Sequence, residues 1–296
     1  MNRRAPGWLV ITKKEYVENV RNAWIITVSL VFLCITLLTA WLIAALGFDG
    51  FAAGRAGAFE RVVATLSAMQ AFGGFLPPIL ALMLGFATLA GERESGSLGL
   101  LTAQPVSRTE IVIGKWLGLW GVLATAVLVG FGLGGLGVVA RAGAGPEGYQ
   151  ALLVFLLATL AWGAAWTSIT VLLSSFFARR GTAIAGSVGI WFLFGSFVWT
   201  ILTFLLVSAA TGNTPIQSLE DVPPWLVVTQ LLNPNQVYDG LLTSSIEGFG
   251  IAMDLGGVGR EALRELYQLT LFSAAMAAWI ALPLAGAVAL FRRRDI

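Results

Sequence analysis

The chain has 296 residues, of which 57% are hydrophobic and 11% are charged, with a net charge of +2 and a mean hydropathy of +0.83. Because a soluble domain has about 25% charged residues, this composition excludes a soluble globular protein and indicates an integral membrane protein. A single cysteine, Cys34, and the lack of histidine exclude an intramolecular disulfide, a Cys/His metal cluster and catalysis by histidine.

The N-terminal residues 1–23 are too polar for a signal peptide, and they lack its apolar core and its small-residue cleavage site. Within residues 8–23, apolar side chains recur at helical spacing opposite Lys14, Glu18 and Arg21, which predicts an amphipathic helix. Such a helix is expected to lie along the inner leaflet of the membrane. Its membrane-surface residues are Trp8, Tyr16, Val17 and Val20. A plain cytoplasmic extension of the first membrane span is the alternative.

Six apolar segments are long enough to cross the hydrocarbon core of a bilayer, which takes about 20 residues as a helix. They are residues 24–47, 71–90, 116–140, 151–177, 182–208 and 270–290. The expected fold class is therefore an all-α integral membrane protein with six transmembrane helices, in which residues 1–296 form a single transmembrane domain.

Two of these segments carry local signals. Pro77 and Pro78 lie in the outer part of the second segment, where proline removes backbone hydrogen bonds and predicts a kink. Gly130 and Gly134 in the third segment have the GxxxG spacing that lets two helices approach closely, although chance in a glycine-rich chain explains that spacing equally well.

None of the six segments contains Asp, Glu, Lys or Arg. Proton pumps and many ion-coupled carriers need ionisable groups at membrane depth, so a carrier driven by its own intramembrane carboxylates is not expected. The chain also lacks the GxxxxGK[ST] loop that binds nucleotide phosphates. Any energy for transport is therefore expected to come from another protein.

The Lys and Arg residues between the segments predict the orientation. Most of them lie on the side that holds both termini, and the positive-inside rule places that side in the cytoplasm. Residues 91–110 then form a cytoplasmic loop, and the acidic stretch of residues 209–269 faces outside.

The loop 91–110 concentrates charge between two apolar segments. Glu92, Arg93 and Glu94 precede a leucine-containing stretch, and Ser107 and Glu110 have the spacing of a capping box that opens the next helix. A short helix with charges at one end and leucines on one side suits docking to a soluble protein. An ordinary juxtamembrane loop whose charges stay in water explains the pattern equally well.

Several stretches together resemble the ABC-2 type permeases, which are the membrane subunits of type V ABC exporters. They are "NVRNAWIITVSLVFL" in the first span, "GERESGSL" after the second, "SRTEIVIGKW" before the third, "GIWFLF" in the fifth, "PPWLVVTQLLNPNQVYDGLL" outside and the C-terminal "ALFRRRDI". Their order and spacing cover nearly the whole chain. Within the family, the chain is most similar to the NosY-like permeases of nitrous-oxide-reductase maturation.

The resemblance implies a half-transporter in the inner (cytoplasmic) membrane of a prokaryote, which dimerises and recruits two copies of a separate ATPase. ATP is then bound by that partner, so the permease itself is expected to be no enzyme and to hold no cofactor or metal. Residues 91–110 would contain the coupling helix, and residues 8–23 would be the connecting helix. The residues that would contact the ATPase or steady the loop are Glu92, Arg93, Glu94, Ser95, Gly96, Ser97, Leu98 and Arg108, with Lys115.

The family also folds part of the outer segment back into the outer leaflet. Carried onto this sequence, residues 223–242 would be re-entrant, with Trp225 as the interface anchor and Asn233–Pro234 as the turn; a plain soluble loop is the alternative. The family's dimer contact would involve the first and fifth spans. Candidate residues for it, or for membrane anchoring, are Trp24, Trp41, Trp191, Phe194 and Trp199.

The sequence says less about the cargo of the transporter than about its mechanism. Uncharged segments favour a lipidic or amphiphilic cargo, and five scattered methionines with one cysteine and no histidine argue against a copper path. A sulfur species, or force on an outer-face accessory protein, fits metalloenzyme maturation better. The alternatives are an ABC-2 exporter of lipids, drugs or other amphiphiles, a stand-alone channel or carrier, and a membrane enzyme. Expected partners are the ATPase, a second copy of the chain and membrane lipids, and no nucleic acid.

Overall fold

A computed structural model describes residues 6–46, 57–102, 105–211, 224–249 and 268–293, and these residues form helices and connections without a β-strand. The helices are α1 (Gly7–Val20), α2 (Ala23–Leu46), α3 (Ala58–Gly73), α4 (Leu76–Gly85), α5 (Ala90–Glu94), α6 (Ser97–Thr102), α7 (Arg108–Val127), the π-helix η1 (Leu128–Gly132), α8 (Leu133–Ala142), α9 (Gly145–Phe176), α10 (Arg180–Phe194), α11 (Ser196–Thr211), α12 (Pro224–Leu231), α13 (Pro234–Ser245) and α15 (Leu269–Arg293).

Three helices of the described part are long and apolar enough to cross a membrane. They are the continuous segment α7–η1–α8, which covers Arg108–Ala142, the long helix α9, and α15. The pair formed by α3 and residues 76–94 makes a fourth candidate if its bend of 42° lies within one span. The prediction of an all-helical chain with membrane-length apolar helices is thereby confirmed, and the count of six spans stays a prediction.

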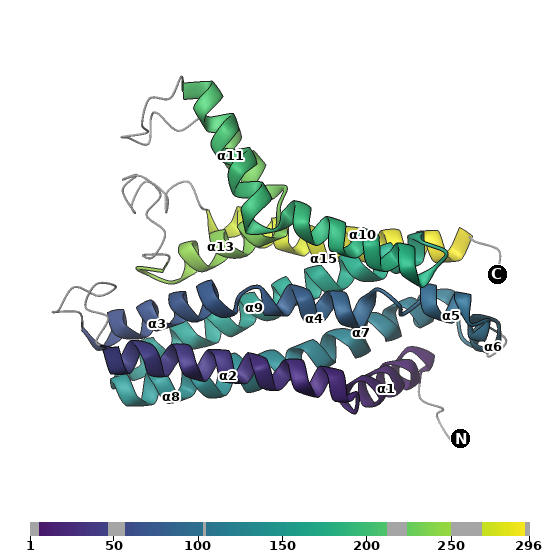
Figure 1. The fold of residues 1–296 in the computed structure, drawn as a ribbon, viewed down its shortest axis with the longest axis horizontal. Coiled ribbons are helices and arrows are strands. Elements are labelled where there is room, and N and C mark those ends of the chain that lie inside the picture. Colours follow the sequence, from purple (N-terminus) through teal and green to yellow (C-terminus); the bar gives the residue numbers. More distant parts are fainter. Residues whose placement is uncertain (1–5, 47–56, 103–104, 212–223, 250–267, 294–296) are drawn as a thin grey trace.

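The helices form an elongated bundle, and connections between them lie at both of its ends (Figure 1). α1, α5, α6, the start of α7, the start of α10 and the end of α15 lie together at what we call the terminal end. The end of α2, the start of α3, the turn between α8 and α9 and the end of α13 lie at the opposite, loop end. The loop 91–110 and both described chain ends therefore share one end of the bundle.

α9 is the central helix of the bundle, because it packs against α15, α4, α7 and α13. Its middle contains several small buried residues between two buried tryptophans, and neighbouring helices approach closely at the small ones. At Gly163, for example, an added Cβ would lie 2.4 Å from a methyl group of Leu123 on α7. The aromatic core continues beside it, where Phe131 of η1 stacks edge-on against Phe155 of α9 at 5.1 Å.

α2 crosses the third apolar segment at its two GxxxG glycines. A Cβ at Gly130 would lie 2.8 Å from the Phe32 ring, and one at Gly134 would lie 2.7 Å from the Thr36 methyl group. These distances are shorter than van der Waals contact, so the close helix approach predicted from the spacing is confirmed.

The helix of the second apolar segment begins at Ala58, well before the predicted start at residue 71, and bends where α3 gives way to α4. Gly74 donates its N–H to the carbonyl of Gln70 at 2.7 Å, and a Cβ there would lie 2.3 Å from that oxygen. Pro77 and Pro78 follow in the first turn of α4, where a missing N–H leaves no helical bond unmade. The predicted kink is confirmed, and it lies just before the two prolines.

The fifth predicted span, residues 182–208, is not one continuous helix. α10 ends at Phe194 and α11 begins at Ser196, because Gly195 leaves helical geometry with ψ of 145°. The apolar pattern runs through this position without change, so only the glycine itself signalled the break.

The outer segment contains two short helices, α12 and α13, joined at Asn233. Each is too short to cross a membrane, and α13 packs against α9 and α15. The rest of the predicted outer stretch, residues 212–223 and 250–267, lies outside the described residues.

The proposed dimer-seam aromatics differ in exposure. Trp41 is 63% exposed, whereas Trp199 is 9% exposed and its ring lies 6.2 Å from that of Phe194. Trp191 is half-buried, and the side chain of Trp24 lies outside the described ones. Of the four candidates whose side chains are described, Trp41 therefore offers the most surface to a neighbouring chain or to lipid.

Candidate functional site

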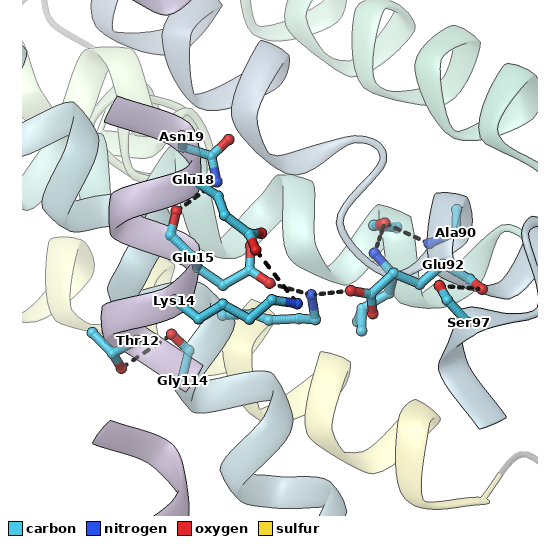
Figure 2. Close-up of polar contacts among 12 residues, drawn as sticks. Thr12, Lys14, Glu15, Glu18, Asn19, Ala90, Glu92, Ser97 and Gly114 are labelled. Carbon is cyan, nitrogen blue, oxygen red and sulfur yellow. Dashed lines mark hydrogen bonds and ion pairs between the residues drawn. The ribbon is translucent and has the colours of Figure 1, made fainter. Parts of the chain in front are cut away.

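A buried lysine joins three elements at the terminal end. The side chain of Lys115, on α7, is 1% exposed, and its Nζ lies 2.5 Å from Glu15 Oε1 of α1 and 2.8 Å from Glu92 Oε1 of α5 (Figure 2). We call Glu15, Glu92 and Lys115 the lysine cluster. It connects the predicted connecting helix, the predicted coupling segment and the third apolar segment.

The lysine cluster is stabilised by the pairing of its opposite charges. A charge buried without a partner costs several kcal/mol, and removing one partner of a buried pair costs about 3–5 kcal/mol. Two carboxylates share one ammonium group here, and Glu92 Oε2 is buried with no hydrogen-bond partner among the described residues. The position of α5 is therefore tied energetically to both α1 and α7.

α1 lies against α7 along a row of glycines. A Cβ at Gly114 would lie 2.7 Å from the Trp8 carbonyl oxygen, and one at Gly118 would lie 2.5 Å from Glu15 Cβ. Two hydrogen bonds add to this contact: Thr12 Oγ1 donates to the Gly114 carbonyl at 3.1 Å, and the hydroxyls of Tyr16 and Thr125 lie 3.0 Å apart. The missing side chains on α7 let Glu15 reach Lys115.

The predicted membrane-surface residues divide between two faces of α1. Trp8 and Val17 are exposed, beside the exposed apolar Leu9 and Val10. Tyr16 and Val20 are partly buried and pack against the core. Lys14 and Glu18 form an exposed ion pair of 3.8 Å on another side of the helix. α1 therefore has one face on α7 and an exposed face that carries Leu9, Val10 and Val17 together with Lys13.

α5 holds the end of α9 and the start of α10. Ser174 Oγ, on α9, accepts hydrogen bonds from the N–H groups of Leu89 and Ala90, each at 3.0 Å. Arg93 Nη1 donates to the Phe177 carbonyl at 2.9 Å. Glu94 Oε2 accepts the backbone N–H of Arg180, the first residue of α10, at 2.8 Å. Two of the predicted coupling residues thus contact the turn between α9 and α10.

The turn between α5 and α6 contains the remaining predicted coupling residues. Gly96 has a φ of 73°, which favours glycine, and the hydroxyls of Ser95 and Ser97 lie 2.9 Å apart. Glu94, Ser95 and Gly96 are exposed, whereas Leu98 is 1% exposed and packs inward. The surface of this turn is therefore polar, and its one buried leucine anchors it.

Arg108 and Ser107 secure the return of the chain into α7. Arg108 Nη1 donates to the carbonyls of Phe291 and Arg292 at the end of α15, at 3.3 and 3.1 Å. Ser107 Oγ accepts the N–H of Glu110, and Glu110 Oε2 accepts the N–H of Ser107. The predicted capping box is confirmed.

Sequence reasoning missed Glu15, Ser174 and the backbone of Arg180. The one available signal was Lys115, because a lysine flanked by apolar residues at the start of a membrane segment needs a buried partner. Nothing in the sequence says which of the carboxylates about 100 residues away would supply it. Within the described ranges, no group of three or more His, Cys, Asp and Glu side chains could hold a metal ion.

The sequence of the chain matches known proteins over nearly its whole length. Residues 9–296 match the family described as ABC-2 family transporter protein. The chain is 32% identical over 286 residues to the probable ABC transporter permease protein NosY of Stutzerimonas stutzeri, covering 96% of this chain and 97% of that one. It is 33% identical over 291 residues to the probable ABC transporter permease protein NosY of Pseudomonas aeruginosa, covering 97% and 98% of the two chains.

Proposed function

Because the chain belongs to the ABC-2 family of transporter proteins and is a NosY-like permease of an ABC transporter, we propose that it works as a homodimer driven by a separate ATPase. The ATPase binds and hydrolyses ATP, and the permease converts its closing motion into movement of the membrane helices. The permease itself carries out no chemical step and needs no cofactor.

The lysine cluster is the observation that supports this mechanism best. α5 is held by Glu92 to α1 and α7, and by Arg93 and Glu94 to the turn between α9 and α10. A partner that pushes on α5 therefore pushes on four helices at once. The exposed turn at residues 94–96 is the surface that the ATPase contacts in this proposal.

We assign the chain six membrane spans with both termini in the cytoplasm of a prokaryote. In this topology α2, α3–α4, α7–η1–α8, α9, α10–α11 and α15 are the spans, and the terminal end is cytoplasmic. α1 is the connecting helix, and its exposed Leu9, Val10 and Val17 rest on the inner leaflet. The pair α12–α13 is the re-entrant hairpin of the outer leaflet.

For cargo we propose a sulfur species delivered for metalloenzyme maturation, such as that of nitrous oxide reductase, or force passed to an outer-face protein. This proposal rests on the similarity to NosY permeases and on the few soft metal ligands in the sequence. Vesicles that contain the permease and its ATPase should show no ATP-dependent copper uptake. ATP-dependent copper flux would overturn the cargo proposal, and flux of a lipid or a drug would favour the amphiphile exporter.

The docking assignment is tested by reversing one exposed charge of the coupling turn. Glu94→Arg should weaken co-purification with the ATPase encoded beside the permease gene and should reduce stimulated ATP hydrolysis, since it changes the proposed contact surface. Glu147→Arg is the matched control, because Glu147 is an exposed first-turn carboxylate of α9 at the loop end. Equal behaviour of the two variants would contradict the assignment.

A further inference from the structure

The break between α10 and α11 is closed by two asparagines from the hairpin α12–α13. The carbonyl oxygen of Phe194, the last residue of α10, accepts the side-chain N–H of Asn235 at 2.8 Å and that of Asn233 at 3.1 Å. Asn233 is 0% exposed. A broken helix leaves carbonyls without helical partners, and in a membrane each unpaired group is costly. These two amides therefore stabilise the break itself.

The same asparagines are held from their other side. Asn235 Oδ1 accepts the indole N–H groups of Trp162 and Trp166 on α9, each at 3.0 Å. The backbone N–H of Asn235 donates to Asn233 Oδ1 at 2.8 Å, which caps α13. We call Asn233 and Asn235, with the Phe194 carbonyl and the two indoles, the asparagine clamp. It joins α9, α10 and α13.

α13 is also fixed to α9 one turn further along. Tyr238 stacks flat on Trp162, with ring centroids 4.4 Å apart and an interplanar angle of 1°. Its hydroxyl lies 2.8 Å from Thr159 Oγ1. α13 is therefore a packed part of the bundle, and the turn that precedes it reaches the break directly.

The opposite end of α10 is attached to the coupling segment. The backbone N–H of Arg180 donates to Glu94 Oε2, and the Arg180 guanidinium lies over the Phe86 ring at 5.4 Å. Between Arg180 and Phe194 the helix is unbroken and, at 1.5 Å per residue, about 22 Å long. One rigid element thus connects α5 to the asparagine clamp.

α10 is supported along one side only. Ala183 and Ser187 are buried against the bundle, whereas Ile184, Val188 and Phe192 are exposed. It packs mainly against α9, α4, α5 and α11, and Phe194 at its end also contacts Asn233, Asn235 and Trp279 of α15. A helix held at both ends and along one face can tilt as a rigid body without unpacking the core.

From these contacts we infer that α10 is a lever that carries movement of α5 to the hairpin α12–α13, with Asn233 and Asn235 as the positioning residues of its far end. This inference rests on the proposed function, because the ATPase supplies the movement. It adds the route by which motion at the terminal end reaches the outer hairpin.

The experiment follows both ends of the lever in the complex of permease and ATPase. Bimane is attached to a cysteine that replaces exposed Ile184 on α10 or, in a second protein, exposed Val228 on α12, each with Cys34→Ser. Its fluorescence is recorded before and after ATP with vanadate. Asn235→Ala removes the amide, and Asn233→Ser keeps an acceptor for the α13 cap but removes the long amide N–H that donates to Phe194, which the shorter serine hydroxyl does not replace. Gln236→Ala, next to Asn235, is the matched control, since the Gln236 side chain makes no hydrogen bond with any described residue.

In the parent protein and in Gln236→Ala, both positions should respond to nucleotide. In Asn235→Ala and Asn233→Ser, the response at position 228 should be lost, while the response at position 184 and stimulated ATP hydrolysis remain. If the asparagines had a purely structural role, the responses at positions 184 and 228 would be lost or kept together. An undiminished response at 228 in both variants, or no response at 228 in a parent that responds at 184, would overturn the lever alone. A parent without ATPase binding and without response at either position would overturn the proposed function and the lever together.

Discussion

Two polar clusters, one charged and one neutral, each join three helices of the protein. The lysine cluster joins α1, α5 and α7 near the start of α7 with one ammonium group and two carboxylates. The asparagine clamp joins α9, α10 and α13 near the middle of α9 with neutral amides, indoles and a carbonyl. Both are buried, yet only the one at the bundle end uses formal charge.

The difference follows from the cost of charge at depth. A charged residue at the centre of a membrane helix costs about 2.5–3.5 kcal/mol on insertion scales, and less near the ends. Neutral groups can be stabilised by hydrogen bonds alone, as Asn235 is by two indole donors and one carbonyl acceptor. Charge is therefore used where a soluble partner is proposed to dock, and neutral amides are used where the chain turns back inside the bundle.

The largest expected effect is the loss of the shared cation. Lys115→Met leaves the buried Glu15 carboxylate and the partly buried Glu92 carboxylate without their shared cation, so we expect a loss of about 3–5 kcal/mol in stability. Thermal unfolding of the purified protein in detergent measures this loss. Lys14→Met, at an exposed ion pair, should change stability by less than about 1 kcal/mol. Similar melting of the two variants would show that the lysine cluster contributes no more than a surface pair.

The second effect is on the neutral cluster. Asn235→Ala leaves the indole N–H groups of Trp162 and Trp166 without acceptors, and each buried unsatisfied group costs about 1–3 kcal/mol. The melting temperature should fall clearly, and less than in Lys115→Met, because an unsatisfied neutral N–H costs less than a buried carboxylate without its cation and each variant strands two groups. Gln236→Ala should melt like the parent protein. A larger loss in Asn235→Ala than in Lys115→Met would show that the neutral cluster stabilises the protein more than the charged one.

The third effect concerns the packing that brings Glu15 to Lys115. Gly118→Ala places a Cβ 2.5 Å from Glu15 Cβ, and overpacking of this kind costs about 1–3 kcal/mol. Gly137→Ala, in the same apolar segment, has nothing within 4 Å of the added Cβ and should be neutral or stabilising by up to about 1 kcal/mol. Thermal unfolding of both variants separates close packing from helix propensity, and equal melting would argue against the glycine contact.

The last expected effect is a pH slope of at most about 1.4 kcal/mol per pH unit, because it involves one proton. In α13, which is not one of the membrane-length helices, burial raises the pKa of Asp239 to about 7, while a hydrogen bond from Gln70 Nε2 opposes that rise. Between about pH 4 and pH 7 the folded protein then holds a proton that the unfolded chain releases, so stability falls as the pH rises through this window.

Asp239→Asn should remove this slope. Melting temperatures between pH 4.5 and pH 8 provide the measurement, and Glu147→Gln, an exposed carboxylate on α9, is the control that should leave the slope unchanged. An unaltered slope in Asp239→Asn would assign the pH dependence to another group.

Local features of the molecule were predictable from the sequence. The capping box of Ser107 and Glu110 lies within four consecutive residues, and the close approach at Gly130 and Gly134 needs only two missing side chains. The lysine cluster was only half predictable, because Lys115 and Glu92 stood out as charges beside apolar runs, whereas Glu15 looked like any other residue of an amphipathic helix. The break at Gly195 was missed because a glycine in an apolar run is equally compatible with a continuous helix.

The sequence by itself determined the class of the protein, because long apolar stretches can satisfy their backbone hydrogen bonds in lipid only as helices. It also determined the family, through the order and spacing of its motifs. The tertiary structure alone decided which buried polar groups meet. Lys115 finds Glu15 across 100 positions, and Asn235 finds Trp162 across 73. Such contacts depend on how whole helices pack together. The hydrophobic pattern of a helix shows which of its faces is buried, but not which other helix that face contacts.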